Sequence, residues 1–172
     1  MELHCHLDGS LALEMIRRHT GKKVTMDMLC AGESCKSLAE YLEKFKLPLE
    51  CLQDKAGIRD GAYTFLKEAA KENIRNIEVR FAPMLSVRGG LSCSAVIESV
   101  LEGLEKGKKE CGVKYNMITC AMRHHNPAQN LQMLYTAREY LGNGVCAIDL
   151  TGNESAFPTW KFVDLFTEAR KL

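Results

Sequence analysis

The sequence predicts an α/β fold in which a parallel sheet is connected by helical crossovers. Strand-like segments alternate with segments whose apolar residues recur at helical spacing. The four strand-like segments are residues 2–7, 74–83, 113–123 and 145–150. A helix is expected after each of them, and this order is typical of β/α units with a parallel sheet.

The first connection is the longest. A helix over residues 11–19 should end at Gly21, because glycine readily closes a helix C-terminus. Residues 24–56 then form a long excursion. Within it, Ser37 and Glu40 have the spacing of a capping box, which predicts the start of a short amphipathic helix.

The remaining helices follow from periodicity and from capping residues. Apolar residues at helical spacing predict a core-facing helix over residues 58–73 and another around residues 96–104. Asn126 followed by Pro127 is a favourable helix start. The last amphipathic helix should begin at Pro158 and continue to the C-terminus.

Four β/α units could form a small open sheet or half of a (β/α)₈ barrel. An open nucleotide-binding sheet would favour a glycine-rich phosphate turn after the first strand, and the turn over residues 7–10 lacks one. Polar residues instead gather at strand C-terminal ends, as in barrel enzymes. We therefore predict a TIM-barrel type fold, with residues 1–172 supplying the first four β/α units as one domain without an internal boundary. These polar residues are His4, His6, Asp8, Arg80, Arg123, His124, Asp149 and Gly152.

Composition narrows the class of protein. Hydrophobic residues make up 46% of the chain, the net charge is +1 and charges of both signs are interspersed. We therefore expect neither a nucleic-acid groove nor a membrane-binding patch. The eight cysteines include no Cys-x-x-Cys pair, which favours free, mostly buried thiols in a reducing cytoplasm. Charged residues near the N-terminus exclude a signal peptide there, and no segment is long enough to span a bilayer.

The N-terminal strand carries a candidate metal site. His4 and His6 are two residues apart, so on a strand both imidazoles project to the same face. Two such histidines provide half of a zinc site, since neutral imidazole is a preferred ligand of zinc. Asp8 follows in the turn, beside this position. A histidine pair alone is equally typical of a polar surface.

Four segments together carry a resemblance to a known family. They are residues 2–10 (Glu-Leu-His-Cys-His-Leu-Asp-Gly-Ser), 77–83 (Ile-Glu-Val-Arg-Phe-Ala-Pro), 120–124 (Cys-Ala-Met-Arg-His) and 147–154 (Ala-Ile-Asp-Leu-Thr-Gly-Asn-Glu). In this order they resemble the adenosine deaminase family of the metal-dependent hydrolase superfamily. The resemblance implies a zinc-dependent (β/α)₈ hydrolase that converts adenosine or deoxyadenosine to inosine and ammonia.

The resemblance also implies roles for single residues. It makes His4 and His6 zinc ligands, Asp8 a contact of the ribose 5′-hydroxyl, and the backbone N–H of Gly152 a donor to purine N3. It further implies a lid over the nucleoside. An apolar face at helical spacing supplies this lid, although the spacing alone would indicate ordinary core. The lid residues are Leu38, Tyr41, Leu42 and Phe45.

Other polar residues near the site stay open. Glu78 and Arg80 share a face of the second strand, and we expect them to form a structural charge pair. Asp149 either orients a ligand from behind or satisfies backbone groups. His124 and His125 are adjacent, so a strand would point them to opposite faces, and we expect neither to bind the metal.

The resemblance places the general acid, the general base and the other zinc ligands beyond the fourth strand. No histidine follows His125, so we expect no catalytic acid or base in this chain. We therefore predict the N-terminal half of a deaminase, inactive alone and prone to self-association through its exposed sheet edges. The alternatives are a related adenine or modified-adenosine deaminase, and a non-catalytic half-barrel or one part of a split protein.

Overall fold

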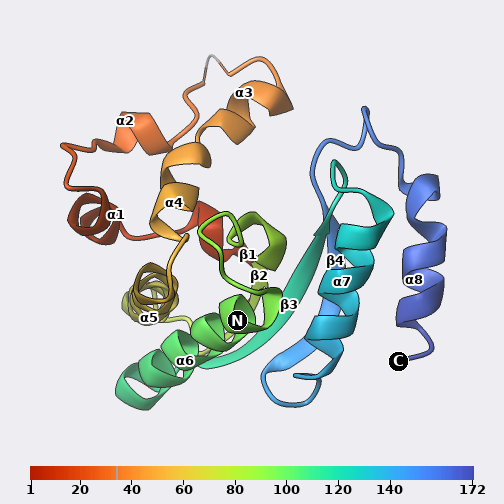
Figure 1. The fold of residues 1–172 in the computed structure, drawn as a ribbon. Coiled ribbons are helices and arrows are strands. Elements are labelled where there is room, and N and C mark those ends of the chain that lie inside the picture. The colour runs from red at the N-terminus through yellow and green to blue at the C-terminus, as the bar shows by residue number, and fades with distance from the viewer. Residues whose placement is uncertain (34) are drawn as a thin grey trace.

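A four-stranded parallel sheet forms the centre of the computed structural model, which describes residues 1–33 and 35–172. The strands lie in chain order, β1-β2-β3-β4 (Figure 1). All four predicted strands are confirmed, with small shifts at their ends. Their bounds are β1 Glu2–His6, β2 Asn76–Phe81, β3 Lys114–Met122 and β4 Val145–Thr151.

Helices follow each strand, so the predicted alternation of strands and helices is confirmed. In the described part of the first connection there are five helices, and one long helix each follows β2 and β3. The helices are α1 Leu13–Thr20, α2 Met26–Leu29, α3 Leu38–Glu43, α4 Lys46–Cys51, α5 Lys55–Lys71, α6 Cys93–Cys111, α7 Pro127–Arg138 and α8 Val163–Ala169. Short 3₁₀ turns occupy Leu7–Gly9, Pro83–Leu85 and Thr159–Phe162.

Capping residues explain several helix ends. Asn126 caps α7 with a complete capping box, in which Gln129 returns the hydrogen bond, and Pro127 is the first helical residue. Gly21 ends α1 in the left-handed conformation, as predicted. Ser37 accepts from Glu40 N–H at the start of α3, but the Glu40 carboxylate bonds Lys36 N–H rather than Ser37. The expected capping box is therefore half formed.

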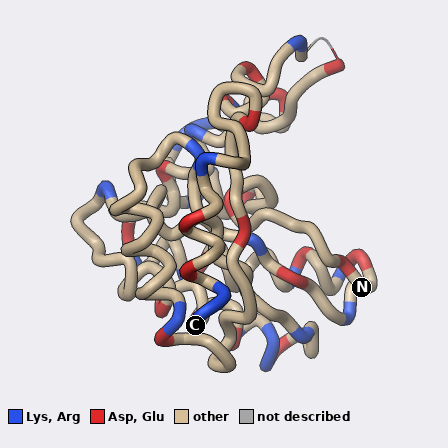
Figure 2. Tube along the Cα trace, turned by 90° about the vertical axis from the view of Figure 1, so that its right-hand side faces the viewer, with Lys and Arg blue, Asp and Glu red and all other residues tan. Residues whose placement is uncertain are grey.

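The helices cover one face of the sheet. Apolar side chains of α5, α6 and α7 pack on Ile77, Val79, Phe81 and Met117, and this cluster is the main core. Figure 1 shows α5 beside α6 and α7 beside α8, and these pairs are in contact. Charges of both signs are interspersed along the chain in Figure 2. No helix in the described part of the chain combines the length and apolar character needed to cross a bilayer.

The opposite face of the sheet is mostly polar. Glu78, Arg80 and Asp149 are half-buried there. A small apolar cluster covers only the part of this face near the C-terminal ends of β2 and β3. That cluster consists of Ala82, Cys120 and Met122, with Leu85 against it. The helices leave this face uncovered, and we call it the open face. In a complete barrel it would be the inner face of the curved sheet.

Of the two predictions about the cysteines, free thiols and mostly buried thiols, the first is confirmed and the second is wrong. All eight are free, as predicted, but only Cys51, Cys93 and Cys120 are fully buried. The expectation of mostly buried thiols was therefore wrong. Burial raises the pKa of the Cys120 thiol to about 12, so this thiol stays protonated at neutral pH.

Candidate metal and nucleoside site

An irregularity in β1 decides where its histidines point. Glu2 is paired with Ile77 and Cys5 with Val79, so three steps along β1 match two steps along β2. The extra residue is a β-bulge, which changes the side to which the following residues project. After it, Cys5 packs against the main core, and His6 lies beside Arg80 on the open face.

The two histidine rings lie close together. Their centroids are 5.5 Å apart, and the ring planes are tilted by 47°. His4 is exposed and His6 half-buried. The expected juxtaposition of the imidazoles is therefore present, at the C-terminal end of β1.

The environment of His6 favours its neutral form. Burial lowers its pKa most, His4 and Arg80 lower it further, and Asp149 acts in the opposite direction. Neutral imidazole is the form that binds a metal. In residues 1–33 and 35–172, no group of three or more His, Cys, Asp or Glu side chains is arranged to hold a metal ion. Among the described residues, the candidate site therefore consists of the two histidines alone.

The charge pair behind the histidines differs from the expected one. Arg80 Nε donates to Asp149 Oδ2 at 2.8 Å, whereas Glu78 has no ion pair within the described residues. The expected Glu78–Arg80 pair is therefore wrong. Glu78 and Arg80 share a face of β2. The Arg80 guanidinium nevertheless extends across β3 and meets Asp149 on β4 instead. The other oxygen of Asp149 accepts from Leu150 N–H at 2.7 Å.

Asp8 is a buried carboxylate directly after β1. It lies in the turn Leu7–Gly9 and is only 5% exposed. Burial raises its pKa to about 6, and the backbone N–H groups of Asp8 and Gly9 offset part of this rise. Its Oδ1 is buried without a hydrogen-bond partner among the described residues. A buried polar atom of this kind is costly unless a ligand or water satisfies it.

Gly152 begins the loop after β4. Its φ of +121° favours glycine, and a Cβ built there would lie 3.4 Å from the Cβ of Arg123. Arg123 is 8% exposed and holds the same loop. It donates to Phe157 O at 2.8 Å and to Thr159 Oγ1 at 3.1 Å. Sequence reasoning placed Arg123 at the end of its strand but missed this function, because its partners lie 34 and 36 residues further on.

The expected lid is outside the core. Leu38, Tyr41 and Leu42 are 45%, 44% and 37% exposed, so the reading of this face as ordinary core is wrong. Phe45 lies just beyond α3, and its ring contacts Tyr41 edge-on with centroids 5.4 Å apart. A Cβ built on Gly9 would lie 3.0 Å from Phe45 Cε1. Phe45, the last of the expected lid residues, therefore packs on the turn that carries Asp8.

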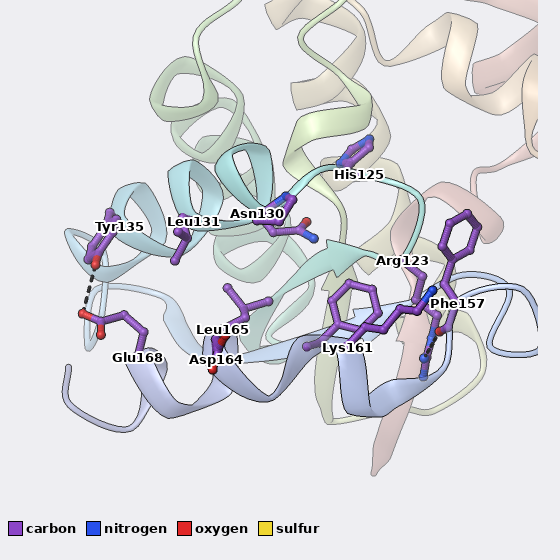
Figure 3. Close-up of a pocket in the computed structure, with 12 residues that line it drawn as sticks. Arg123, His125, Asn130, Leu131, Tyr135, Phe157, Lys161, Asp164, Leu165 and Glu168 are labelled. Carbon is purple, nitrogen blue, oxygen red and sulfur yellow. Dashed lines mark hydrogen bonds between the residues drawn. The ribbon is translucent and has the colours of Figure 1, made fainter.

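A separate cleft of about 410 Å³ lies between α7 and α8 (Figure 3). Its apolar wall includes Leu131 and Leu165, and a hydrogen bond from Tyr135 to Glu168 closes one end. None of the predicted metal, substrate or lid residues lines this cleft. His125 lies at its rim.

Solved structures share this fold. An amidohydrolase from Burkholderia ambifaria with bound Zn matches with a TM-score of 0.83 at 19% identity, over 99% of this chain and 49% of that one. Adenine deaminase from Arthrobacter aurescens (TM-score 0.80, 20% identity) and N6-methyl-AMP deaminase from Arabidopsis thaliana (0.79, 24%) each match over 99% of this chain and 54% of theirs. The fold is that of the TIM-barrel amidohydrolases, of which this chain forms the first four β/α units.

Sequence relatives narrow the class further. The adenosine deaminase family model matches residues 1–172, and the chain belongs to this family. The adenosine deaminase of Clostridium perfringens is 35% identical over all of this chain and 54% of its own length. That of Clostridium kluyveri is 37% identical over 99% of this chain and 52% of its own. The chain thus spans about half the length of the curated relatives it matches.

Proposed function

We propose that this chain supplies the nucleoside-binding half of a zinc-dependent adenosine deaminase, which hydrolyses adenosine or deoxyadenosine to inosine and ammonia. The observation that carries the proposal is the meeting of three features at one end of the sheet. These are the histidine pair of β1, the buried Asp8 with its unpartnered oxygen, and the exposed apolar lid above it. The free thiols are compatible with action in the cytoplasm.

The residues present fit zinc as part of a larger ligand set. His4 and His6 present two imidazoles on one face, and the surroundings of His6 keep its ring neutral. A catalytic zinc normally has three protein ligands and one open position, so these two would be completed by further ligands. When bound, zinc would supply an activated water for attack at purine C6.

The remaining residues would bind and enclose the nucleoside. A ribose 5′-hydroxyl would give the buried Oδ1 of Asp8 the donor that it lacks among the described residues. The N–H of Gly152 would donate to purine N3, with Arg123 holding the loop in place. The lid face of Leu38, Tyr41, Leu42 and Phe45 would exclude water from the base and sugar. The proposal assigns no general acid or base to this chain, so we expect it to be inactive alone.

Deamination of a related compound is the second candidate function. The chemistry of Asp8 distinguishes a nucleoside substrate from a free base or a nucleotide. The structural neighbours named adenine deaminase and N6-methyl-AMP deaminase act on compounds with no ribose and with a 5′-phosphate, respectively. A carboxylate at the 5′ position would accept a hydrogen bond from a hydroxyl but repel a phosphate. A free base would leave Asp8 unpartnered. The chemistry of Asp8 thus favours a nucleoside.

Calorimetric titration of the chain with adenosine, AMP and adenine tests this choice. We expect weak binding of adenosine and at least about tenfold weaker binding of AMP and adenine, since loss of a buried hydrogen bond to a charged group costs about 1.5–3 kcal/mol. Asp8→Ala should abolish the preference for adenosine. The exposed Asp164 provides the matched control, because Asp164→Ala should leave the preference unchanged.

Tighter binding of AMP than adenosine would favour a nucleotide deaminase. Preference for adenine that persists in Asp8→Ala would favour a base deaminase. If none of the three compounds binds a folded chain, the non-catalytic half-barrel becomes the better account.

A further inference from the structure

The bulge in β1 leaves backbone groups outside the regular ladder, and side chains satisfy them. The carbonyl of Leu3 accepts a hydrogen bond from Arg80 Nη1 at 2.6 Å. The N–H of His4 donates to the Glu2 carboxylate at 2.8 Å. Backbone groups that a bulge displaces from the ladder need other hydrogen-bond partners, and the Arg80 guanidinium supplies one for Leu3.

Arg80 is itself held by a residue of β4 on the same face of the sheet. Its Nε donates to Asp149 Oδ2 at 2.8 Å, and the Arg80 side chain is only 15% exposed. One guanidinium on β2 therefore joins the bulge of β1 to a carboxylate of β4, across β3. A planar guanidinium can do this because its donors point in fixed, divergent directions.

The position of the bulge decides which face of the sheet His6 lies on, so the contacts of Arg80 also affect the histidines. The bulge lies between Glu2 and Cys5, and only the register after it brings His6 beside Arg80. In the register before it, His6 would be paired with Phe81, whose side chain belongs to the main core. A bulge that relaxes would thus turn the histidine pair away from the open face.

We propose that Arg80 is a positioning residue, which together with Asp149 fixes the bulge at Leu3–His4 and so aims His4 and His6 at the metal. The inference rests on the proposed zinc site. It has a counterintuitive consequence, since Arg80 is a cation beside a cation site. By charge alone, its removal would strengthen zinc binding, whereas the positioning role predicts that zinc binding weakens.

Zinc affinity of the 172-residue chain provides the test, measured by competition with a chromophoric chelator. Loss of groups that orient metal ligands typically costs about 10–100-fold in affinity, and we expect about tenfold weaker binding in Arg80→Met and in Asp149→Asn. Arg80→Lys should be nearly as weak, because an ammonium restores the charge but not the fork. Arg75 is exposed and precedes β2 at the opposite end, so Arg75→Met is the matched control and should bind like the parent chain.

A second measurement follows the backbone directly. Amide hydrogen exchange of residues 3–6, read by NMR, should accelerate in Arg80→Met and Arg80→Lys while the exchange of β3 stays slow. This pattern separates a local effect on the bulge from general unfolding, and it needs no metal.

The outcomes are distinguishable. Parent-like or tighter zinc binding in Arg80→Met, or full rescue by Arg80→Lys, would overturn the positioning role. Zinc binding by the parent chain that survives His4→Ala together with His6→Ala would overturn the proposed zinc site instead. Should the parent chain bind no zinc, unchanged exchange of residues 3–6 in Arg80→Met would still refute the positioning role, and faster exchange would support it.

Discussion

The Phe45 ring stands directly over Gly9, close enough that a Cβ on Gly9 would lie 3.0 Å from Cε1 and 3.2 Å from Cζ of the ring. This contact joins the lid segment to the turn that carries Asp8. It explains why glycine suits this position although the main chain there has no positive φ. A side chain on Gly9 would force the ring, and the lid face with it, to move.

Gly9→Ala should therefore impair nucleoside binding more than stability. The contacted atoms are the far end of a side chain, which can swing aside, so we expect the free energy of unfolding to change by less than about 1 kcal/mol. Adenosine binding, measured by calorimetry, should weaken about two- to tenfold. Phe45→Ala should weaken it similarly, and the double variant should be no worse than the single ones, because both changes disturb one contact. Additive losses would show that Gly9 acts independently of Phe45.

The ion pair of α1 with α5 predicts a pH dependence of stability. Arg18 Nη2 and His19 Nε2 lie 2.5 Å and 2.8 Å from Asp60 Oδ2. Burial raises the pKa of Asp60, but the hydrogen bonds and charges of Arg18 and His19 outweigh it and lower the pKa below its ordinary value. A carboxylate with a depressed pKa stabilises the fold at neutral pH, and this contribution disappears as the pH falls through the folded-state pKa.

We therefore expect Asp60→Asn to reduce the free energy of unfolding by about 0.5–1 kcal/mol at pH 7, as for partly exposed ion pairs. The difference from the parent chain should shrink as the pH falls below the ordinary pKa of an aspartate and through the lower folded-state pKa of Asp60. Urea unfolding at pH 7, 5 and 3 measures it. Asp164→Asn is the control, since Asp164 is exposed and has no ion pair among the described residues. A deficit of Asp60→Asn that persists undiminished at low pH would contradict the electrostatic explanation.

Much of the fold could be predicted because its signals are local. The helix start at Asn126 and Pro127 and the helix end at Gly21 each depend on a few neighbouring residues. The helix α4 was missed because Pro48, within its first turn, resembles a helix breaker in the sequence. The candidate site was predicted less completely. The alternation of side chains along a strand correctly predicted that His4 and His6 lie side by side. It could not show whether they lie on the helix-covered face or on the open face of the sheet.

That choice of face depends on the bulge, and the bulge depends on contacts between distant parts of the chain. Arg80 and its partner Asp149 are 69 residues apart in sequence. Nothing in the local pattern distinguished Asp149 from the nearer Glu78 as the partner. A single sequence shows which residues can form charge pairs, but only the register of the sheet shows which pairs form.

The open edge of β4 predicts association between copies of this chain. Within the described residues β3 is the only strand beside β4, which otherwise has just an isolated bridge from Val145 to Leu141. Its Cys146 and Ala147 are exposed beside a small groove that includes Leu134 and Leu141. Unpaired strand edges invite pairing with another chain. We expect light scattering to show dimers or larger species that increase with protein concentration.

A charge on this edge should oppose the association. Ala147→Lys should shift the chain towards the monomer, since lysine on an edge strand discourages pairing. Ala128→Lys is the control, because Ala128 is exposed on α7, away from the edge. A parent chain that stays monomeric at high concentration would contradict this prediction.

The ultraviolet change that accompanies conversion of adenosine to inosine shows whether this chain is one half of an adenosine deaminase. It should be measured for this chain alone and for this chain joined to the second half of the Clostridium kluyveri relative, which is 37% identical in the shared part. We expect no turnover by the chain alone. The joined protein should show zinc-dependent turnover that His6→Ala abolishes, because groups that act as a catalytic unit fail together. Turnover by these 172 residues alone, or none by a folded and zinc-loaded joined protein, would contradict the account.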